Sequence, residues 1–297
     1  MTHARFDTVG LIGKYSDPGM SDALGRVADF LTARDRRVLL DESTAAVCAG
    51  HDLEVATRAG LGERADLIIV VGGDGTLLNA ARTLADYGPL LVGVNLGRLG
   101  FLTDISPDHL EDRLEAILEG YYHVEDRFLL KASIQRDGQT ISEATALNDT
   151  VIHKWEIARM IEVDTYIDGR FLNSIRADGL IVSTPTGSTA YALSGGGPIL
   201  EPSLNAMTLV PICPHTLSNR PIVVGGDRHV ELRVSANGQP QAQLTCDGQM
   251  NLGLAAGDRV IISKHPAPLH LLHPADHDHY EILRAKLHWG GPPLGRD

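Results

Sequence analysis

The chain has 297 residues, 43% of them hydrophobic, which is enough for one large domain or two of moderate size. Its 26 basic and 38 acidic residues give a formal net charge of −12, which argues against a protein that neutralises a nucleic acid backbone. Three cysteines without a Cys-x-x-Cys pair favour a reducing compartment, and no apolar run reaches transmembrane length, so we expect a cytoplasmic protein with neither a nucleic acid nor a membrane as partner.

Strands and helices alternate over the first part of the chain. Apolar runs predict strands at residues 6–13, 36–41, 65–73 and 89–95. Helical spacing predicts helices at residues 20–34, 76–86 and 107–119. Alternation of this kind is typical of a parallel sheet with right-handed crossovers. We therefore expect residues 1–123 to form a Rossmann-like α/β domain that carries the glycine-rich loop described next.

A glycine-rich turn with one acid, Gly72-Gly73-Asp74-Gly75-Thr76, follows the third predicted strand. It fits neither the Walker A pattern nor the Gly-x-Gly-x-x-Gly/Ala fingerprint, in which Leu78 takes the third position. The glycines permit positive φ, and the helix start behind them offers N–H groups and a partial positive charge to an anion. Asp74 then suits a proton acceptor or a Mg²⁺ ligand beside bound phosphate. The alternative is that Asp74 only caps the helix.

From about residue 124 the apolar residues alternate with period two around Asp-Gly turns such as Asp168-Gly169. This pattern predicts an antiparallel β domain over residues 124–270. Helical spacing returns near the end, and we expect the segment 271–297 to pack back on the α/β domain. The predicted fold class is thus α/β plus all-β.

A hydroxyl-rich block lies inside the predicted β domain. Between Ser183 and Thr189 it carries five hydroxyl groups in seven residues, followed by Tyr191. Hydroxyls at a helix start suit ribose hydroxyls and a diphosphate, and the tyrosine ring suits an adenine. The alternative is an ordinary Ser/Thr-rich turn.

These motifs resemble those of the NAD kinases and stand in the order that this family has. They are GGDGT at 72–76, NLGRLGFL at 95–102, LND at 147–149, the block at 178–200, PHTLSNRP at 214–221 and LLHPADHDHYEILRAKLHWG at 271–290. GGDGT alone is shared with proteins similar to diacylglycerol kinases and phosphofructokinases, whereas the block at 178–200 is highly specific. The set covers essentially the whole chain and looks most like the Gram-negative bacterial form.

The resemblance implies an ATP-dependent phosphotransferase that moves the γ-phosphoryl group of ATP to the 2′-hydroxyl of the adenosine ribose of NAD, making NADP. It implies Mg²⁺ or another divalent cation with ATP, a homodimer or homotetramer, and the fold of NAD kinases and diacylglycerol kinases. Asp74 is implied as the general base on the 2′-hydroxyl. A lipid kinase and a non-enzymatic NAD-binding sensor are the alternatives.

The resemblance also implies the residues that bind substrates. Asn148 and Asp149 face the adenosine end of NAD, and many relatives carry Glu where this sequence has Asp149. Arg176 matches a basic position associated with choosing NAD over NADH. The expected binding set is Gly72, Gly73, Asp74, Gly75, Thr76, Phe101, Asn148, Asp149, Arg159, Arg176, Asp178, Thr186, Gly187, Ser188, Thr189, Ala190, Tyr191 and Gln249.

Five histidines crowd the C-terminal stretch: His265, His270, His273, His277 and His279. His273 and His277 have the i, i+4 spacing that a zinc site on a helix uses. Pro274 disfavours a helix there, however, and no nearby Cys or Glu completes a ligand set. We therefore expect no metal site formed by the protein alone.

Overall fold

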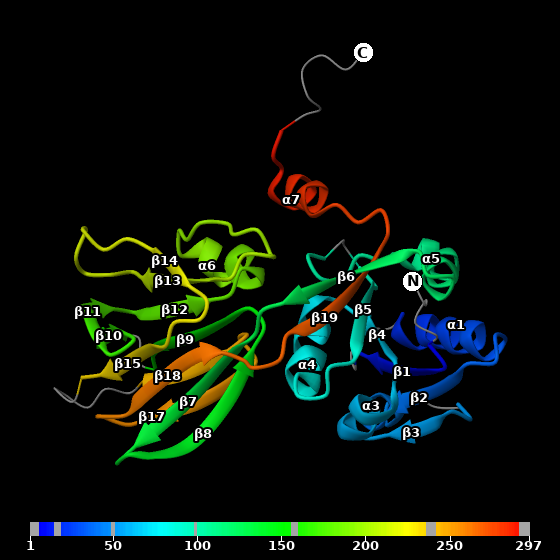
Figure 1. Cartoon of the computed structure of the whole chain (residues 1–297), viewed down its shortest axis with the longest axis horizontal. Coiled ribbons are helices and arrows are strands. Elements are labelled where there is room, and N and C mark those ends of the chain that lie inside the picture. The colour runs from blue at the N-terminus through cyan, green and yellow to red at the C-terminus, as the bar shows by residue number, and fades with distance from the viewer. Residues whose placement is uncertain are drawn as a thin grey trace. The chain divides into compact units, whose positions relative to one another are not determined.

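The structure is a computed structural model that describes residues 6–14, 19–48, 51–97, 100–155, 160–235 and 242–290. It divides into two compact units (Figure 1). The N-terminal unit comprises Met1–Glu125 together with His270–Asp297, and the C-terminal unit comprises Asp126–Leu269. Among the described residues, no helix combines the length and the apolar character that crossing a membrane requires.

A seven-stranded sheet forms the centre of the N-terminal unit. In spatial order its strands are β3 (Glu54–Ala56), β2 (Arg37–Asp41), β1 (Thr8–Gly13), β4 (Leu67–Gly72), β5 (Leu90–Asn95), β19 (Leu269–Pro274) and β6 (Tyr122–Arg127). From β3 to β19 each strand pairs in parallel with the next. Figure 1 shows β19, in orange, beside the cyan β5, so the end of the chain contributes to the first sheet.

Helices cover this sheet because their apolar residues recur at helical spacing. They are α1 (Met20–Thr32), α2 (Glu42–Ala45), α3 (Arg58–Arg64), α4 (Asp74–Leu84), η1 (Pro107–His109) and α5 (Leu110–Leu118). The last helix, α7 (His279–Leu287), follows β19. In α1, for example, Met20, Leu24, Val27 and Leu31 are all buried. These α1 residues form one apolar core with buried residues of α5 and with one face of β1, β4 and β5.

The C-terminal unit consists of two antiparallel sheets of six strands each. The first sheet runs β11 (Arg170–Ala177), β10 (Ile161–Ile167), β15 (Val230–Val234), β18 (Arg259–Lys264), β7 (Leu130–Arg136) and β8 (Gln139–Ala146). The second runs β14 (Ile222–Gly225), β13 (Ala206–Ile212), β12 (Gly179–Ser183), β9 (Asp149–Lys154), β16 (Ala242–Cys246) and β17 (Met250–Leu254). Asp-Gly pairs with positive φ at both residues close three of the turns, at 137–138, 168–169 and 247–248.

The two sheets share a single core, to which alternate residues of strands in both sheets contribute. The central strand β12 of the second sheet is buried along its whole length. Its second face is covered by the short helix α6 (Tyr191–Ser194), because Ala192 packs against Val151, Ile181 and Val210. The 3₁₀ turn η2 (Thr186–Thr189) leads from β12 into α6. The predicted fold class, α/β followed by antiparallel β, is confirmed.

Candidate functional site

The glycine-rich loop of the N-terminal unit joins the fully buried strand β4 to α4. The helix begins at Asp74, two residues earlier than predicted, and Gly73 is its N-cap. Gly73 has φ of −107°, and no residue of the loop is among those with positive φ in the described chain. The glycines of the loop therefore do not adopt the positive φ that they permit. The N-terminal end of α4 still directs its dipole and amide groups to the loop.

The Asp74 side chain points away from its own helix. Its Oδ2 accepts a hydrogen bond from the Phe101 N–H at 2.8 Å, and its Oδ1 accepts from the Leu102 N–H at 3.1 Å and the Thr103 hydroxyl at 3.0 Å. We call these three donors the Asp74 clamp. A Cβ at Gly100 would lie 2.1 Å from Asp74 Oδ1, so only glycine leaves room for it. The capping interpretation of Asp74 is wrong, because no side chain caps α4.

The clamp leaves the carboxylate able to accept one more proton. Each carboxylate oxygen has about two lone pairs, and Oδ2 of Asp74 uses one of them for the Phe101 N–H. Phe101 itself is half-buried, and Lys286 of α7 holds its Nζ 5.6 Å from the centre of the phenyl ring. The C-terminal helix therefore contacts the loop that fixes Asp74.

A cavity of about 440 Å³ lies within the C-terminal unit. Its lining combines apolar side chains with several polar groups, as expected for a small-molecule site. The lining residues are Asn148, Asp149, Val151, His153, Lys154, Asp178, Ala190, Tyr191, Ile212, Thr245, Asp247 and Gly248. Five residues of the predicted binding set thus share one cavity: Asn148, Asp149, Asp178, Ala190 and Tyr191.

Two carboxylates in this cavity influence one another. Asp247 accepts the backbone N–H groups of Leu147 at 3.1 Å, Asn148 at 2.8 Å and Asp149 at 3.2 Å. Asp149 is only 4% exposed. Burial raises the pKa of the Asp149 carboxyl, and the negative charge of Asp247 raises it further, to about 7. Asp149 therefore changes its protonation near neutral pH.

An ion pair and an aromatic ring complete the polar part of the cavity. Lys154 Nζ lies 2.6 Å from Asp178 Oδ1, and both side chains are partly buried. Tyr191 is 48% exposed at the start of α6, so one side of its ring is open to a planar ligand.

Most hydroxyls of the block at 183–189 bond within the protein. Ser188 Oγ donates to the Pro185 carbonyl at 2.6 Å and accepts the Leu200 N–H at 2.9 Å. Ser183 Oγ donates to the Asn148 carbonyl at 3.2 Å. The Pro185 and Asn148 carbonyls also accept the backbone N–H groups of Ser188 and Thr184, so these hydroxyls reinforce the hydrogen bonds that hold the turn. The residues 186–189 do not line the cavity but shape the turn that presents Ala190 and Tyr191.

Two of the predicted binding residues, Arg176 and Gln249, do not line the cavity. Arg176 is exposed on β11, and Gln249 is exposed beside Gly248. Arg159 lies outside the described residues. Conversely, sequence reasoning missed Thr103 of the clamp and Asp247 of the cavity. The Asp-Gly turn at 247–248 is a recognisable sequence signal, but it predicts a hairpin rather than a binding residue.

Two family models match the chain: the ATP-NAD kinase N-terminal domain over residues 9–122 and the ATP-NAD kinase C-terminal domain over residues 147–273. An NAD kinase of Nitrosococcus oceani is 55% identical over 285 residues, which cover 96% of this chain and 97% of that protein. The chain belongs to the ATP-NAD kinase family. Membership in this family identifies the protein as an enzyme that phosphorylates NAD with ATP. The predicted function is therefore confirmed, and the two alternatives, a lipid kinase and a non-enzymatic NAD-binding sensor, are not supported.

Other members of the ATP-NAD kinase family agree in sequence and in fold. An NAD kinase of Pseudomonas entomophila is 50% identical over 293 residues and 99% of each chain, and these relatives come from Gram-negative bacteria, as predicted. An NAD kinase from Archaeoglobus fulgidus, solved in complex with ATP, has a TM-score of 0.74 at 28% identity, covering 96% of this chain and 100% of that chain. A yeast NADH kinase, solved with NADH, has a TM-score of 0.88 at 23% identity, covers 98% of this chain and 90% of that chain, and shares the fold.

Proposed function

We propose that the enzyme phosphorylates the 2′-hydroxyl of the adenosine ribose of NAD, with Asp74 as the general base. The observation that carries this proposal is the Asp74 clamp. Three donors fix the carboxylate in one orientation, and Oδ2 keeps a lone pair for the proton of an attacking hydroxyl. A nucleophile that is held and deprotonated at the moment of attack lowers the barrier without any covalent intermediate on the protein.

The adenosine end of NAD binds in the cavity of the C-terminal unit. The carboxylate of Asp149 accepts hydrogen bonds from ribose hydroxyls, and Asn148 offers both a donor and an acceptor to the nucleoside. The ring of Tyr191 stacks on the adenine. Residues 186–189 hold these contact groups in place rather than bind NAD directly. The roles of Phe101, Arg159, Arg176 and Gln249 stay predictions.

The phosphates of ATP bind at the loop 72–76, where the N-terminal end of α4 attracts an anion. This loop does not suit a resident Mg²⁺, because N–H and O–H donors already surround the carboxylate of Asp74, its one acid. Mg²⁺ instead enters with ATP as part of that substrate and neutralises charge on the triphosphate.

The enzyme works in the cytoplasm as a homodimer or homotetramer. All three cysteines are free, including the exposed Cys213, which suits a reducing compartment. Leu217 is 90% exposed in the loop after β13, and a subunit contact buries such a side chain. Light scattering of the purified enzyme measures the number of subunits.

The substitution Asp74→Asn tests the general base. An amide of the same size cannot take the proton, so we expect kcat to fall about 10²–10⁴-fold. Because NAD binds through other residues, its Kd stays within about twofold by calorimetry. The reaction is followed as NADP formed from NAD, ATP and Mg²⁺.

Asp112→Asn is the matched control, because it removes one exposed acid from α5 of the same unit. This control keeps wild-type kcat. If Asp74→Asn also keeps wild-type kcat, Asp74 is not the base, whereas the family function stands.

A further inference from the structure

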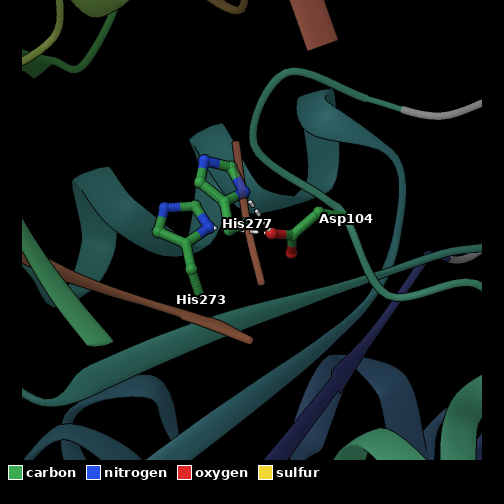
Figure 2. Close-up of side chains that lie close together, drawn as sticks. All are labelled: Asp104, His273 and His277. Atoms are coloured by element: carbon green, nitrogen blue, oxygen red, sulfur yellow. Dashed lines mark hydrogen bonds and ion pairs between the residues drawn. The ribbon is translucent and has the colours of Figure 1, made fainter. Parts of the chain in front are cut away.

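Three polar side chains converge in the N-terminal unit (Figure 2). Asp104 Oδ2 lies 2.9 Å from His273 Nδ1 and 2.7 Å from His277 Nδ1. His273 is in β19, and the turn from Pro274 to His277, closed by a 3.0 Å backbone hydrogen bond, brings the second ring over the first. The two rings stack with their centroids 3.9 Å apart. The turn replaces the helix that Pro274 disfavours, and the carboxylate between the two histidines comes from Asp104, 169 residues before His273 in the sequence.

This cluster is buried and only partly satisfied. The side chains of His273, His277 and Asp104 are 0%, 3% and 10% exposed. Among the described residues, neither Asp104 Oδ1 nor His277 Nε2 has a hydrogen-bond partner, although both atoms are buried. Buried polar atoms without partners are costly. The Nδ1 atoms of both histidines lie close to Oδ2 of Asp104, while Oδ1 of Asp104 has no donor. This arrangement resembles a set of metal ligands around a small volume more than a complete hydrogen-bond network.

The surroundings add negative charge and a further imidazole. Glu125 Oε2 lies 3.8 Å from His273 Nε2, the position of the carboxylate that orients a metal-bound histidine in many sites. The ring of His123 lies 5.5 Å from that of His273 and 5.7 Å from that of His277. His123 and Glu125 alternate along β6 and so face the same side of the sheet. With neutral imidazoles the two carboxylates carry a charge of −2, which a divalent cation neutralises.

We propose that Asp104, His273 and His277 bind a transition-metal ion of the Zn²⁺ class, distinct from the Mg²⁺ that accompanies ATP. Two imidazole nitrogens and one carboxylate oxygen are ligands that Zn²⁺ prefers, and a water takes the fourth position. Ligand atoms around tetrahedral Zn²⁺ lie about 3.3 Å apart, so a small outward shift of the three groups admits the ion.

The site joins the C-terminal segment to the Asp74 clamp. Asp104 directly follows Thr103, whose hydroxyl holds Asp74, and both histidines come from the last part of the chain. An ion bound here fixes the loop 100–104 to the residues after β19. We expect its main effects to be on the stability of the N-terminal unit and on the order of the clamp, rather than on phosphoryl transfer itself.

Metal binding to the full-length enzyme tests this proposal. The protein is stripped with a chelator and titrated with Co²⁺, whose visible d–d absorption reports tetrahedral nitrogen and oxygen ligands, and then with Zn²⁺ by calorimetry. We expect one equivalent of either ion in the wild type, and a rise in Tm when Zn²⁺ is present. Asp104→Asn and His277→Gln weaken binding at least tenfold and abolish the rise in Tm.

His229→Gln is the matched control, because His229 is exposed and belongs to the other unit. It retains wild-type binding. Circular dichroism verifies that each variant is folded. The proposal is overturned if the wild type binds neither ion at one equivalent, a result that needs no variant, or if the folded Asp104→Asn and His277→Gln proteins bind as tightly as the wild type.

Discussion

The buried carboxyl group of Asp149, whose pKa lies near 7, makes the cavity of the C-terminal unit sensitive to pH. Burial of the Asp149 carboxyl raises its pKa, and the nearby charge of Asp247 raises it further, to about 7. Between about pH 4 and pH 7 the folded protein therefore holds a proton that the unfolded chain has released. The contribution of Asp149 to the free energy of unfolding falls across this range as the pH rises, because this group binds more protons in the folded state than in the unfolded state.

The substitution Asp149→Asn removes this pH dependence. Below about pH 4 the variant and the wild type have similar free energies of unfolding, because Asp149 is neutral in both states of the wild type. At pH 8 the variant is more stable by roughly 2–4 kcal/mol, since the wild type then buries an unfavourable charge. Urea unfolding at several pH values measures the difference. A constant difference between the two proteins at all pH values would contradict the assigned titration.

Single residues were predictable from the sequence where a short motif carries the chemistry. Asp74 stood out because an acid rarely lies between glycines after a buried strand. Its partners did not, because two of the three donors are backbone N–H groups that any residue has, and they lie 27 and 28 positions away. Asp247 holds backbone groups nearly 100 residues earlier, so only the folded chain brings it to Asn148 and Asp149.

The turn η2 is the element on which the cavity depends. A Cβ added to Gly187 would lie 2.1 Å from the carbonyl oxygen of Asn148 and 2.4 Å from its carbonyl carbon. Backbone atoms cannot move aside as easily as the end of a side chain can. The turn therefore packs against Asn148, just before β9, at a distance that only glycine allows. This contact sets the position of Asn148 and Asp149 in the cavity.

Gly187→Ala therefore displaces a binding segment. We expect a loss of about 1–3 kcal/mol in the free energy of unfolding, typical of overpacking, and at least a tenfold rise in the Kd for NAD. Gly253→Ala is the control, because an added Cβ on β17 meets no atom within 4 Å. Thermal melts and calorimetry of both variants measure the effects. If Gly187→Ala and Gly253→Ala had the same stability and the same Kd for NAD, the close contact between Gly187 and Asn148 would not be needed for NAD binding.

Long elements were predicted well and short ones were missed. Strands such as β4, which is apolar throughout, and helices such as α1, with a regular apolar stripe, follow from local sequence. The three-residue β3 and the helix α3, which contains two glycines, carry too little local signal and form because the edge of the sheet supports them. The hydroxyls before α6 were visible, but composition alone cannot distinguish a hydroxyl that faces a ligand from one that satisfies a backbone group.

At the scale of the whole molecule, one unit is contiguous in sequence and the other is not. All strands of the two six-stranded sheets lie within Asp126–Leu269, and they share their own core. The N-terminal unit needs β19, which lies between β5 and β6 in its sheet. Without that strand, the backbone groups of β5 lose their partners along one edge.

Separate fragments therefore behave differently. We expect residues 126–269 to fold alone with cooperative thermal unfolding, whereas residues 1–127 alone do not. Replacing residues 128–267 of the full chain by a short Gly-Ser linker restores cooperative unfolding, because it returns β19 to the sheet. Circular dichroism and calorimetry of the three proteins measure this. Cooperative unfolding of residues 1–127 would contradict a requirement for β19.

Because β19 is the last strand in the sequence, it also affects the order in which the two units can fold during synthesis on the ribosome. Residues 126–269 emerge while the earlier part of the chain still exposes open strand edges, so the middle of the protein matures before its beginning. The first sheet is complete only once β19 has been synthesised, because β19 lies between β5 and β6. A chain that stops before β19 therefore leaves one edge of β5 without its neighbouring strand, and chaperones and proteases act on chains with such exposed edges.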